Sequence, residues 1–141
     1  KIERFGKNFN LIDESYNANP SSIKNAINNF SKLETKNGKK YLLLGDMLEL
    51  GKNSDFYHKN ISKIVNQSNI DKLFVYGKNV FKTYQETHKR KQGNVLQNLS
   101  DFDEIFSELI KKNDYLMIKG SNATGLNKLS KLVISGNKNA L

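Results

Sequence analysis

The chain has 141 residues, the size of one ordinary domain, and its 37% hydrophobic and 26% charged residues are typical of a folded protein rather than a disordered one. It contains no cysteine, which excludes a disulfide framework and a thiolate metal site. No apolar run approaches the roughly 20 residues of a membrane span, and residues 1–10 lack the apolar segment of a signal peptide. We therefore expect a cytoplasmic protein.

The formal net charge of +9 raises the question of a nucleic-acid partner. The lysines, however, are spread along the whole chain, and Arg4 and Arg90 are its only arginines. Arginine is the usual residue for bidentate recognition of bases and phosphates. We expect no nucleic-acid partner, and a basic RNA-associated domain stays as a minor hypothesis.

Short apolar runs alternate along the chain with helical periods. The predicted strands are residues 9–13, 40–44, 72–76, 94–97 and 114–118, and the predicted helices are 20–34, 54–65, 79–88, 100–110 and 122–135. Asn19 is the expected N-cap of the first helix, with Pro20 at its first position. Ser54 and Ser100 are expected to cap two others, and Asp103 to complete a capping box.

Strands that alternate with helices predict βαβ units and a parallel sheet with both faces covered. The expected fold is a single three-layer, Rossmann-like α/β domain over residues 1–141, with a mainly parallel sheet flanked by helices. The abrupt start also suggests a fragment of a longer protein.

Unusual polar residues follow three of the predicted strands, and ligands of open parallel sheets bind at the carboxyl ends of strands. The first of these segments offers carboxylates, an aromatic ring and amides, namely Asp13, Glu14, Tyr16, Asn17 and Asn19. The second places Asp46 after a glycine, with His58 further on. The third is Lys119-Gly120-Ser121, where a helix N-terminus favours an anion. The alternative interpretation of each segment is a helix cap, a turn or a solvated side chain.

Two phosphate-binding motifs are absent. The sequence contains neither Gly-x-x-x-x-Gly-Lys-[Ser/Thr] nor Gly-x-Gly-x-x-Gly, and it has no His-rich or Cys-rich metal cluster. We therefore expect no metal site and no independent binding of ATP phosphates.

The same segments carry a family resemblance. Residues 13–20 (DESYNANP), residues 44–51 (LGDMLELG) followed by Ser54 and His58, and residues 118–121 (IKGS) resemble, in order and spacing, the C-terminal domain of Mur ligases that add D-alanyl-D-alanine. The three matches cover the domain nearly end to end.

The resemblance implies an ATP-dependent amide ligase of peptidoglycan synthesis that joins D-alanyl-D-alanine to UDP-MurNAc-tripeptide through an acyl-phosphate. Such enzymes have three domains. The N-terminal domain binds the UDP end of the substrate, and the central domain carries the P-loop and Mg²⁺. The C-terminal domain closes over the central one and helps to bind ATP and the dipeptide. This domain alone is expected to be inactive.

The resemblance places the nucleotide near Asp13, Glu14, Tyr16, Asn17 and Asn19, with the choice between Asp13 and Glu14 for the ribose left open. It makes Asp46, Lys119 and Ser121 candidates for the dipeptide substrate, with Ser54 and His58 supporting the site.

Two departures from the family pattern stand out. Asn122 occupies a position where the family often has arginine, and Arg4 lies too close to the first motif to match the upstream Gly-Arg motif. The alternative function is a stand-alone Rossmann-like module that binds a nucleotide or small anion.

Overall fold

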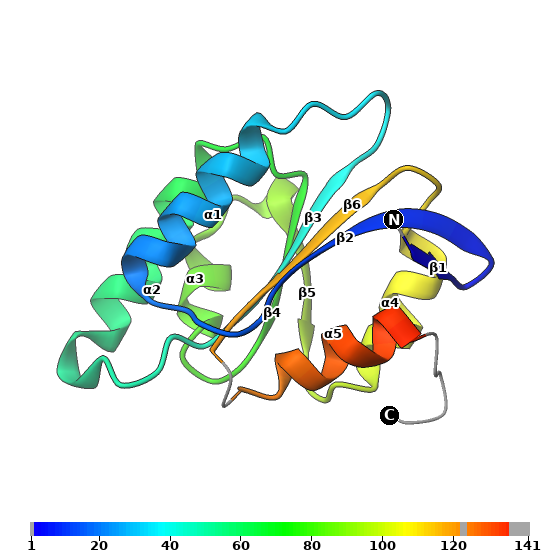
Figure 1. Ribbon diagram of the computed structural model, residues 1–141. Coiled ribbons are helices and arrows are strands. Elements are labelled where there is room, and N and C mark those ends of the chain that lie inside the picture. Colours follow the sequence, from blue (N-terminus) through cyan, green and yellow to red (C-terminus); the bar gives the residue numbers. More distant parts are fainter. Residues whose placement is uncertain (1, 122–123, 136–141) are drawn as a thin grey trace.

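A six-stranded sheet forms the centre of the computed structural model, which describes residues 2–121 and 124–135 (Figure 1). The strand order is β1-β2-β6-β3-β4-β5. β1 pairs antiparallel with β2, and all other pairings are parallel. The strands are β1 (Ile2–Arg4), β2 (Lys7–Glu14), β3 (Lys40–Gly45), β4 (Lys72–Tyr76), β5 (Gln92–Leu96) and β6 (Tyr115–Lys119).

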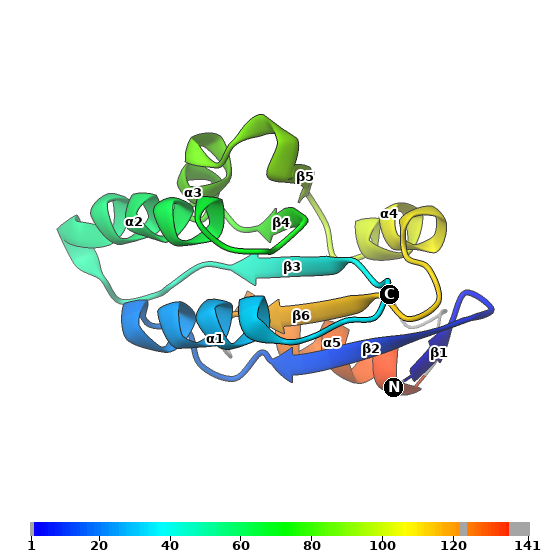
Figure 2. The same ribbon diagram turned by 90° about the horizontal axis from the view of Figure 1, so that it is seen from above.

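Helices cover both faces of the sheet. α1 (Pro20–Lys32), α2 (Ser54–Asn66) and α3 (Phe81–Glu86) lie on one side, and α4 (Asp101–Leu109) and α5 (Leu126–Ser135) lie on the other (Figure 2). Two short 3₁₀ turns, η1 (Gly51–Asn53) and η2 (Lys89–Lys91), complete the described elements. The predicted three-layer α/β fold with a mainly parallel sheet is confirmed.

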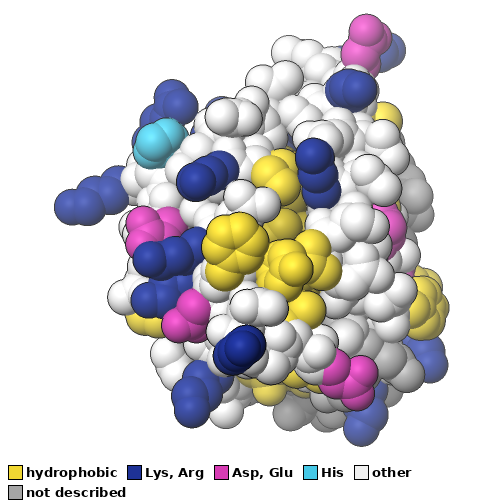
Figure 3. Space-filling model, turned by 90° about the vertical axis from the view of Figure 1, so that its left-hand side faces the viewer, with side chains coloured by type: hydrophobic (Ala, Val, Ile, Leu, Met, Phe, Trp, Pro, Cys, Tyr) yellow, Lys and Arg dark blue, Asp and Glu magenta, His cyan; other side chains and the backbone are white. Residues whose placement is uncertain are grey.

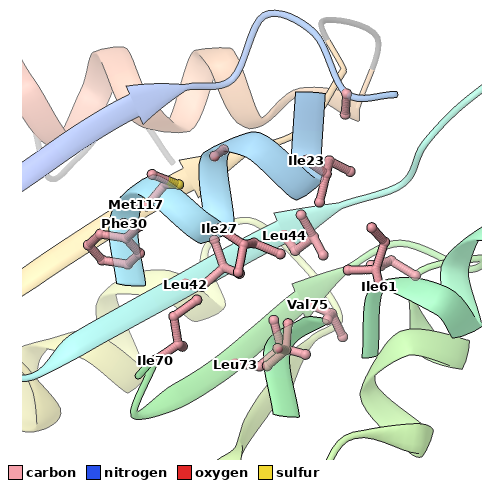
Figure 4. Packing of buried hydrophobic residues seen from close by; sticks show 14 of the residues in the cluster. Ile23, Ile27, Phe30, Leu42, Leu44, Ile61, Ile70, Leu73, Val75 and Met117 are labelled. Atoms are coloured by element: carbon pink, nitrogen blue, oxygen red, sulfur yellow. The ribbon is translucent and has the colours of Figure 1, made fainter. Parts of the chain in front are cut away.

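Each face of the sheet has its own apolar core. Under α1 and α2, buried side chains from the helices interdigitate with alternate residues of β3 and β4, including Ile23, Ile27, Leu42, Leu44 and Val75 (Figure 4). The intervening strand residues point to the other face, where Leu43 and Phe74 pack with aromatic rings of α4. This two-sided burial is why the strands are continuous apolar runs rather than alternating ones.

The structure adds a strand and adjusts several boundaries. β1 was not predicted; it forms a hairpin with β2 through Phe5 and Gly6, which both have positive φ (58° and 72°) as a tight two-residue hairpin turn requires. The weak helix predicted over 79–88 shortens to α3, and the strand predicted over 94–97 begins earlier, at Gln92. Asn122, expected to start the last helix, lies outside the described residues.

The capping predictions succeed at one helix and fail at two. Asn19 caps α1 as predicted, since its Oδ1 accepts from the Ser22 amide (2.8 Å) and its own amide donates to Ser22 Oγ (3.0 Å). Ser54 is not an N-cap, because the 3₁₀ turn before α2 makes Asn53 the capping position. Ser100 occupies the N-cap of α4 without a side-chain bond, and Asp101 instead accepts from the Gln97 and Asn98 amides.

Asp103 was expected to complete that capping box and instead binds Arg4. The Arg4 side chain is fully enclosed, and it donates to both Asp103 carboxylate oxygens (2.9 and 3.1 Å) and to the Leu132 carbonyl (3.1 Å). One guanidinium thus joins the N-terminal hairpin to α4 and α5. A fork of this kind needs the planar, multi-donor geometry of arginine.

We predict that Arg4→Met lowers the free energy of unfolding by about 3 kcal/mol, because it leaves the Asp103 carboxylate and the Leu132 carbonyl without their donor. Urea unfolding of the 141-residue chain measures the loss. Arg90→Met, at an exposed position, is the matched control and should cost under about 0.5 kcal/mol. Equal losses in the two variants would contradict the structural role of Arg4.

At the amino edge of the sheet, two carboxylates hold the loops, the buried Asp114 and the partly exposed Asp71. Asp114 accepts from the Lys39 and Lys111 amides (2.8 Å each), and Asp71 accepts from the Lys40 amide (2.8 Å). Burial, reinforced by these two negative charges, raises the pKa of the neighbouring Tyr41 phenol from 10.0 to about 12. Tyr41 is therefore harder to ionise in the folded chain than in the unfolded one.

A pKa that is raised by folding makes stability fall with pH. The contribution of Tyr41 is fully present below pH 10 and is lost between pH 10 and 12, on the order of 2–3 kcal/mol in total. We predict that urea unfolding at pH 8 and pH 11.5 shows a smaller alkaline loss for Tyr41→Phe than for the wild type. Because the lysines titrate in both proteins, the difference between them reports Tyr41. An identical loss would refute the prediction.

Candidate functional site

Three polar segments meet at the carboxyl edge of the sheet because β6 lies between β2 and β3. The register aligns Lys119 of β6 with Glu14 of β2 on one side and with Leu44 of β3 on the other. The segments that begin at Asp13, Gly45 and Lys119 therefore leave adjacent strands at the same level. The sequence predicted such a gathering at one edge of the sheet, and the strand order explains it.

Lys119 and Glu14 form the charged centre of this edge. The Lys119 side chain is 6% exposed and the Glu14 side chain 40%, and the Nζ–Oε1 distance of 3.7 Å is longer than a hydrogen bond. Beside Lys119 in sequence, Ser121 Oγ is enclosed without a hydrogen-bond partner among the described residues. A buried ammonium with a loose partner and, two residues further along the chain, an unsatisfied hydroxyl are groups that can receive an anion.

Two glycines leave room for Leu126 at the strand ends. A Cβ would lie 2.9 Å from Leu126 Cδ1 at Gly120 and 2.7 Å from the same atom at Gly45, so a side chain at either position would displace Leu126. Thr124 closes the turn by donating to the Ser121 carbonyl (2.7 Å). Gly45, Gly120 and Thr124 thus shape the site without being predicted for it. The sequence signal that could have identified these glycines is their place at the ends of predicted strands, in Gly45-Asp46 and Gly120-Ser121.

The first segment divides into braced and open residues. Asp13 Oδ1 accepts from the amide and hydroxyl of Ser15 (3.1 and 2.5 Å), and Asp13 Oδ2 lies 3.5 Å from the Tyr16 hydroxyl. Asn19 is committed to the α1 cap. Tyr16 and Asn17 are exposed, Tyr16 by 59%. Ring and amide atoms of these two residues are free to meet a ligand.

Asp46 faces the β4–α3 connection. Its Oδ1 accepts from the Val80 amide (2.7 Å), and a Cβ at Gly77, where φ is +140°, would lie only 2.4 Å from that oxygen. One carboxylate oxygen therefore braces two loops, and any contact of Asp46 with a ligand would use the other oxygen.

His58 and Ser54 hold the segment that follows β3 in place. His58 is buried, its Nε2 accepts from the Met47 amide (3.1 Å), and its Nδ1–H donates to the Ser54 carbonyl (2.8 Å). These partners assign the neutral tautomer with the proton on Nδ1. The ring ties the segment after β3 to the first turn of α2.

The described residues contain no group of three His, Cys, Asp or Glu side chains that could hold a metal ion. None of their helices is long and apolar enough to cross a membrane.

Comparison with known proteins assigns the family. The family model for the Mur ligase C-terminal region, described as the glutamate ligase domain, matches residues 2–122. The chain is 32% identical over 134 residues to the UDP-N-acetylmuramoyl-tripeptide–D-alanyl-D-alanine ligase of Bacillus subtilis. It is 36% identical over 135 residues to the enzyme of the same name from Buchnera aphidicola. These alignments cover 88% and 91% of this chain.

The fold comparison agrees. A MurF ligase from Thermotoga maritima in complex with ADP matches with a TM-score of 0.75 at 21% identity, over 89% of this chain. A MurF from Acinetobacter baumannii matches with a TM-score of 0.70 at 22% identity, over 86%. The chain belongs to the Mur ligase family and corresponds to its C-terminal domain. It spans only 28% and 27% of the two curated relatives, and 28% and 27% of the two solved chains.

We predict that His58→Ala loosens the segment of residues 45–50, because the Met47 amide and the Ser54 carbonyl lose their partner inside the protein. The expected cost is about 2 kcal/mol of unfolding free energy, with faster hydrogen exchange at the Met47 amide. His88→Ala, which removes an exposed imidazole, is the matched control. Unchanged exchange at Met47 would show that the loop does not depend on His58.

Proposed function

We propose that this chain is the C-terminal lobe of an ATP-dependent ligase that joins D-alanyl-D-alanine to UDP-MurNAc-tripeptide in peptidoglycan synthesis. The names of the curated relatives support this function, and their greater length supports additional N-terminal and central domains as partners. The central domain would hold the ATP phosphates and Mg²⁺. The lobe alone should release no phosphate from ATP. A cytoplasmic location, as suits an enzyme that consumes ATP, is part of the proposal.

Two observations carry the proposal: Lys119 is enclosed, and two residues further along the chain the enclosed Ser121 hydroxyl has no partner among the described residues. D-alanyl-D-alanine has one carboxylate, and an ammonium in a site of low dielectric binds a carboxylate strongly when a hydroxyl donates as well. Lys119 would exchange its loose contact with Glu14 for that carboxylate. Fixing the carboxylate would hold the dipeptide in position so that its amine can attack the activated tripeptide.

The nucleotide would lie along the first segment. Tyr16 offers an exposed ring for stacking, and the Asn17 amide is available for hydrogen bonds. Asp13 Oδ1 is already engaged by Ser15, whereas Oδ2 has only a 3.5 Å contact with Tyr16. The ribose acceptor would therefore be Asp13 Oδ2 or a Glu14 oxygen, and Asn19 would contribute by fixing the loop at the start of α1. ADP in the solved Thermotoga maritima relative supports a nucleotide as ligand.

We predict that Lys119→Ala in the full-length ligase raises KM for D-alanyl-D-alanine and lowers kcat/KM for it by about 30- to 100-fold, with KM for ATP little changed. Phosphate release with UDP-MurNAc-tripeptide, ATP and the dipeptide measures both constants. Asn17→Ala should show the opposite pattern, a higher KM for ATP with an unchanged KM for the dipeptide.

Lys112→Ala, at an exposed position on the opposite edge of the sheet, is the matched control. Thermal melting must first show that each variant is folded. A folded Lys119→Ala enzyme with wild-type KM for the dipeptide would reduce Lys119 to a bracing role. A phosphate assay with no dependence on D-alanyl-D-alanine in the wild type would refute the proposed reaction itself.

A further inference from the structure

β4 and β5 lie at the opposite edge of the sheet from β1 and β2 (Figure 2). A hollow lies at the carboxyl ends of β4 and β5. It is an open groove of about 660 Å³, within the range of roughly 300–1,000 Å³ typical of small-molecule sites. Its lining includes Tyr76, Lys78, Phe81, Val95, Leu96 and Gln97. Since β3 separates β6 from β4, the groove is two strand spacings, about 10 Å, from Lys119.

The lining suits a flat apolar ring. Tyr76, Val95 and Leu96 supply apolar surface from the strand ends. Phe81, the first residue of α3, is 42% exposed, and its ring stacks on Tyr84 (centroids 6.2 Å apart, planes at 18°). Tyr84 is itself fixed, because its hydroxyl donates to the Gly93 carbonyl (2.9 Å). The groove thus presents an aromatic wall that is held in place before any ligand arrives.

The charges of the groove favour an anion. Lys78 is an exposed ammonium in the lining, Gln97 adds an amide, and none of the lining residues is acidic. The nearby Asp46 does not offset Lys78 fully, because its Oδ1 accepts from the Val80 amide. A ligand with a ring over Phe81 and a carboxylate near Lys78 would satisfy both parts of the surface.

We propose that this groove binds a small planar aromatic anion. It would be a site separate from the Glu14–Lys119 pair. The connection between β4 and α3 rests on Asp46, through the Val80 amide and through Gly77, where a side chain would collide with the carboxylate. A ligand that stiffens this connection would also restrain Asp46. That coupling rests on the proposed ligase function, whereas binding itself does not.

The test is an NMR titration of the ¹⁵N-labelled 141-residue chain with 2-naphthoate. Saturable shifts should be confined to the amides of residues 76–81 and 95–98, with a Kd of about 1 mM for a ligand of this size. The neutral 2-naphthamide should bind about threefold more weakly, because it lacks the charge that Lys78 attracts. Scattered or unsaturable shifts at 10 mM, or equal binding of the two compounds, would overturn the proposal.

Three variants assign the contacts. Phe81→Ser should weaken 2-naphthoate binding at least about tenfold, and Lys78→Gln should abolish the preference over 2-naphthamide. Phe56→Ser is the matched control, since Phe56 is more exposed (65%) but lines a different and smaller groove on α2. On the face shown in Figure 3, hydrophobic side chains reach the surface among scattered basic and acidic ones, so exposure alone does not mark a site. Loss of binding with Phe56→Ser, or full binding with Phe81→Ser, would overturn the assignment. No ligase activity enters this test, so it can fail without affecting the proposed function.

Discussion

The parallel pairing of β6 with both β2 and β3 is the constraint on which the site depends. β6 is the last strand of the described residues in sequence, yet it lies between β2 and β3 in the sheet. It therefore pairs with β2 residues that are about a hundred positions earlier in the chain. This pairing puts Glu14 and Lys119 side by side and brings the Gly45 and Gly120 backbones into contact. If β6 did not lie between them, β2 and β3 would not belong to one continuous sheet, and the polar segments that follow these strands would not meet at one edge.

Many of the aspartate side chains in this domain accept hydrogen bonds from main-chain amides. Five aspartates at or near the ends of strands and helices accept backbone N–H groups, namely Asp13, Asp46, Asp71, Asp101 and Asp114. Such bonds satisfy donors that short connections leave without a partner in the sheet or helices. A carboxylate that follows a strand can therefore stabilise a loop as readily as it can bind a substrate. Asp46 illustrates this, because one of its oxygens holds the next loop while the other is available at the candidate site.

β3, β4 and β6 were predictable because burial on both faces makes them runs of apolar residues, and Asn19-Pro20 marked α1 through local capping chemistry. Features that depend on residues outside the local pattern could not be predicted from the sequence. Ser54 and Ser100 resemble caps in isolation, but a preceding 3₁₀ turn and the Asp101 carboxylate displace them. The β1 hairpin is short and at the edge, with little pattern to detect. The Glu14–Lys119 pair required the β2–β6 register, which no local signal specifies.

Arg4 has a consequence for the order of folding. Its partners Asp103 and Leu132 are 99 and 128 positions away in sequence, so its burial must wait until both helices on that face have docked. Until then the guanidinium keeps its hydration, and β1, whose only partner in the sheet is β2, lacks its link to the two helices. β1 would thus reach its final surroundings only after α4 and α5, although it is synthesised before them. The burial of the Arg4 guanidinium would then be one of the last steps in the folding of this domain.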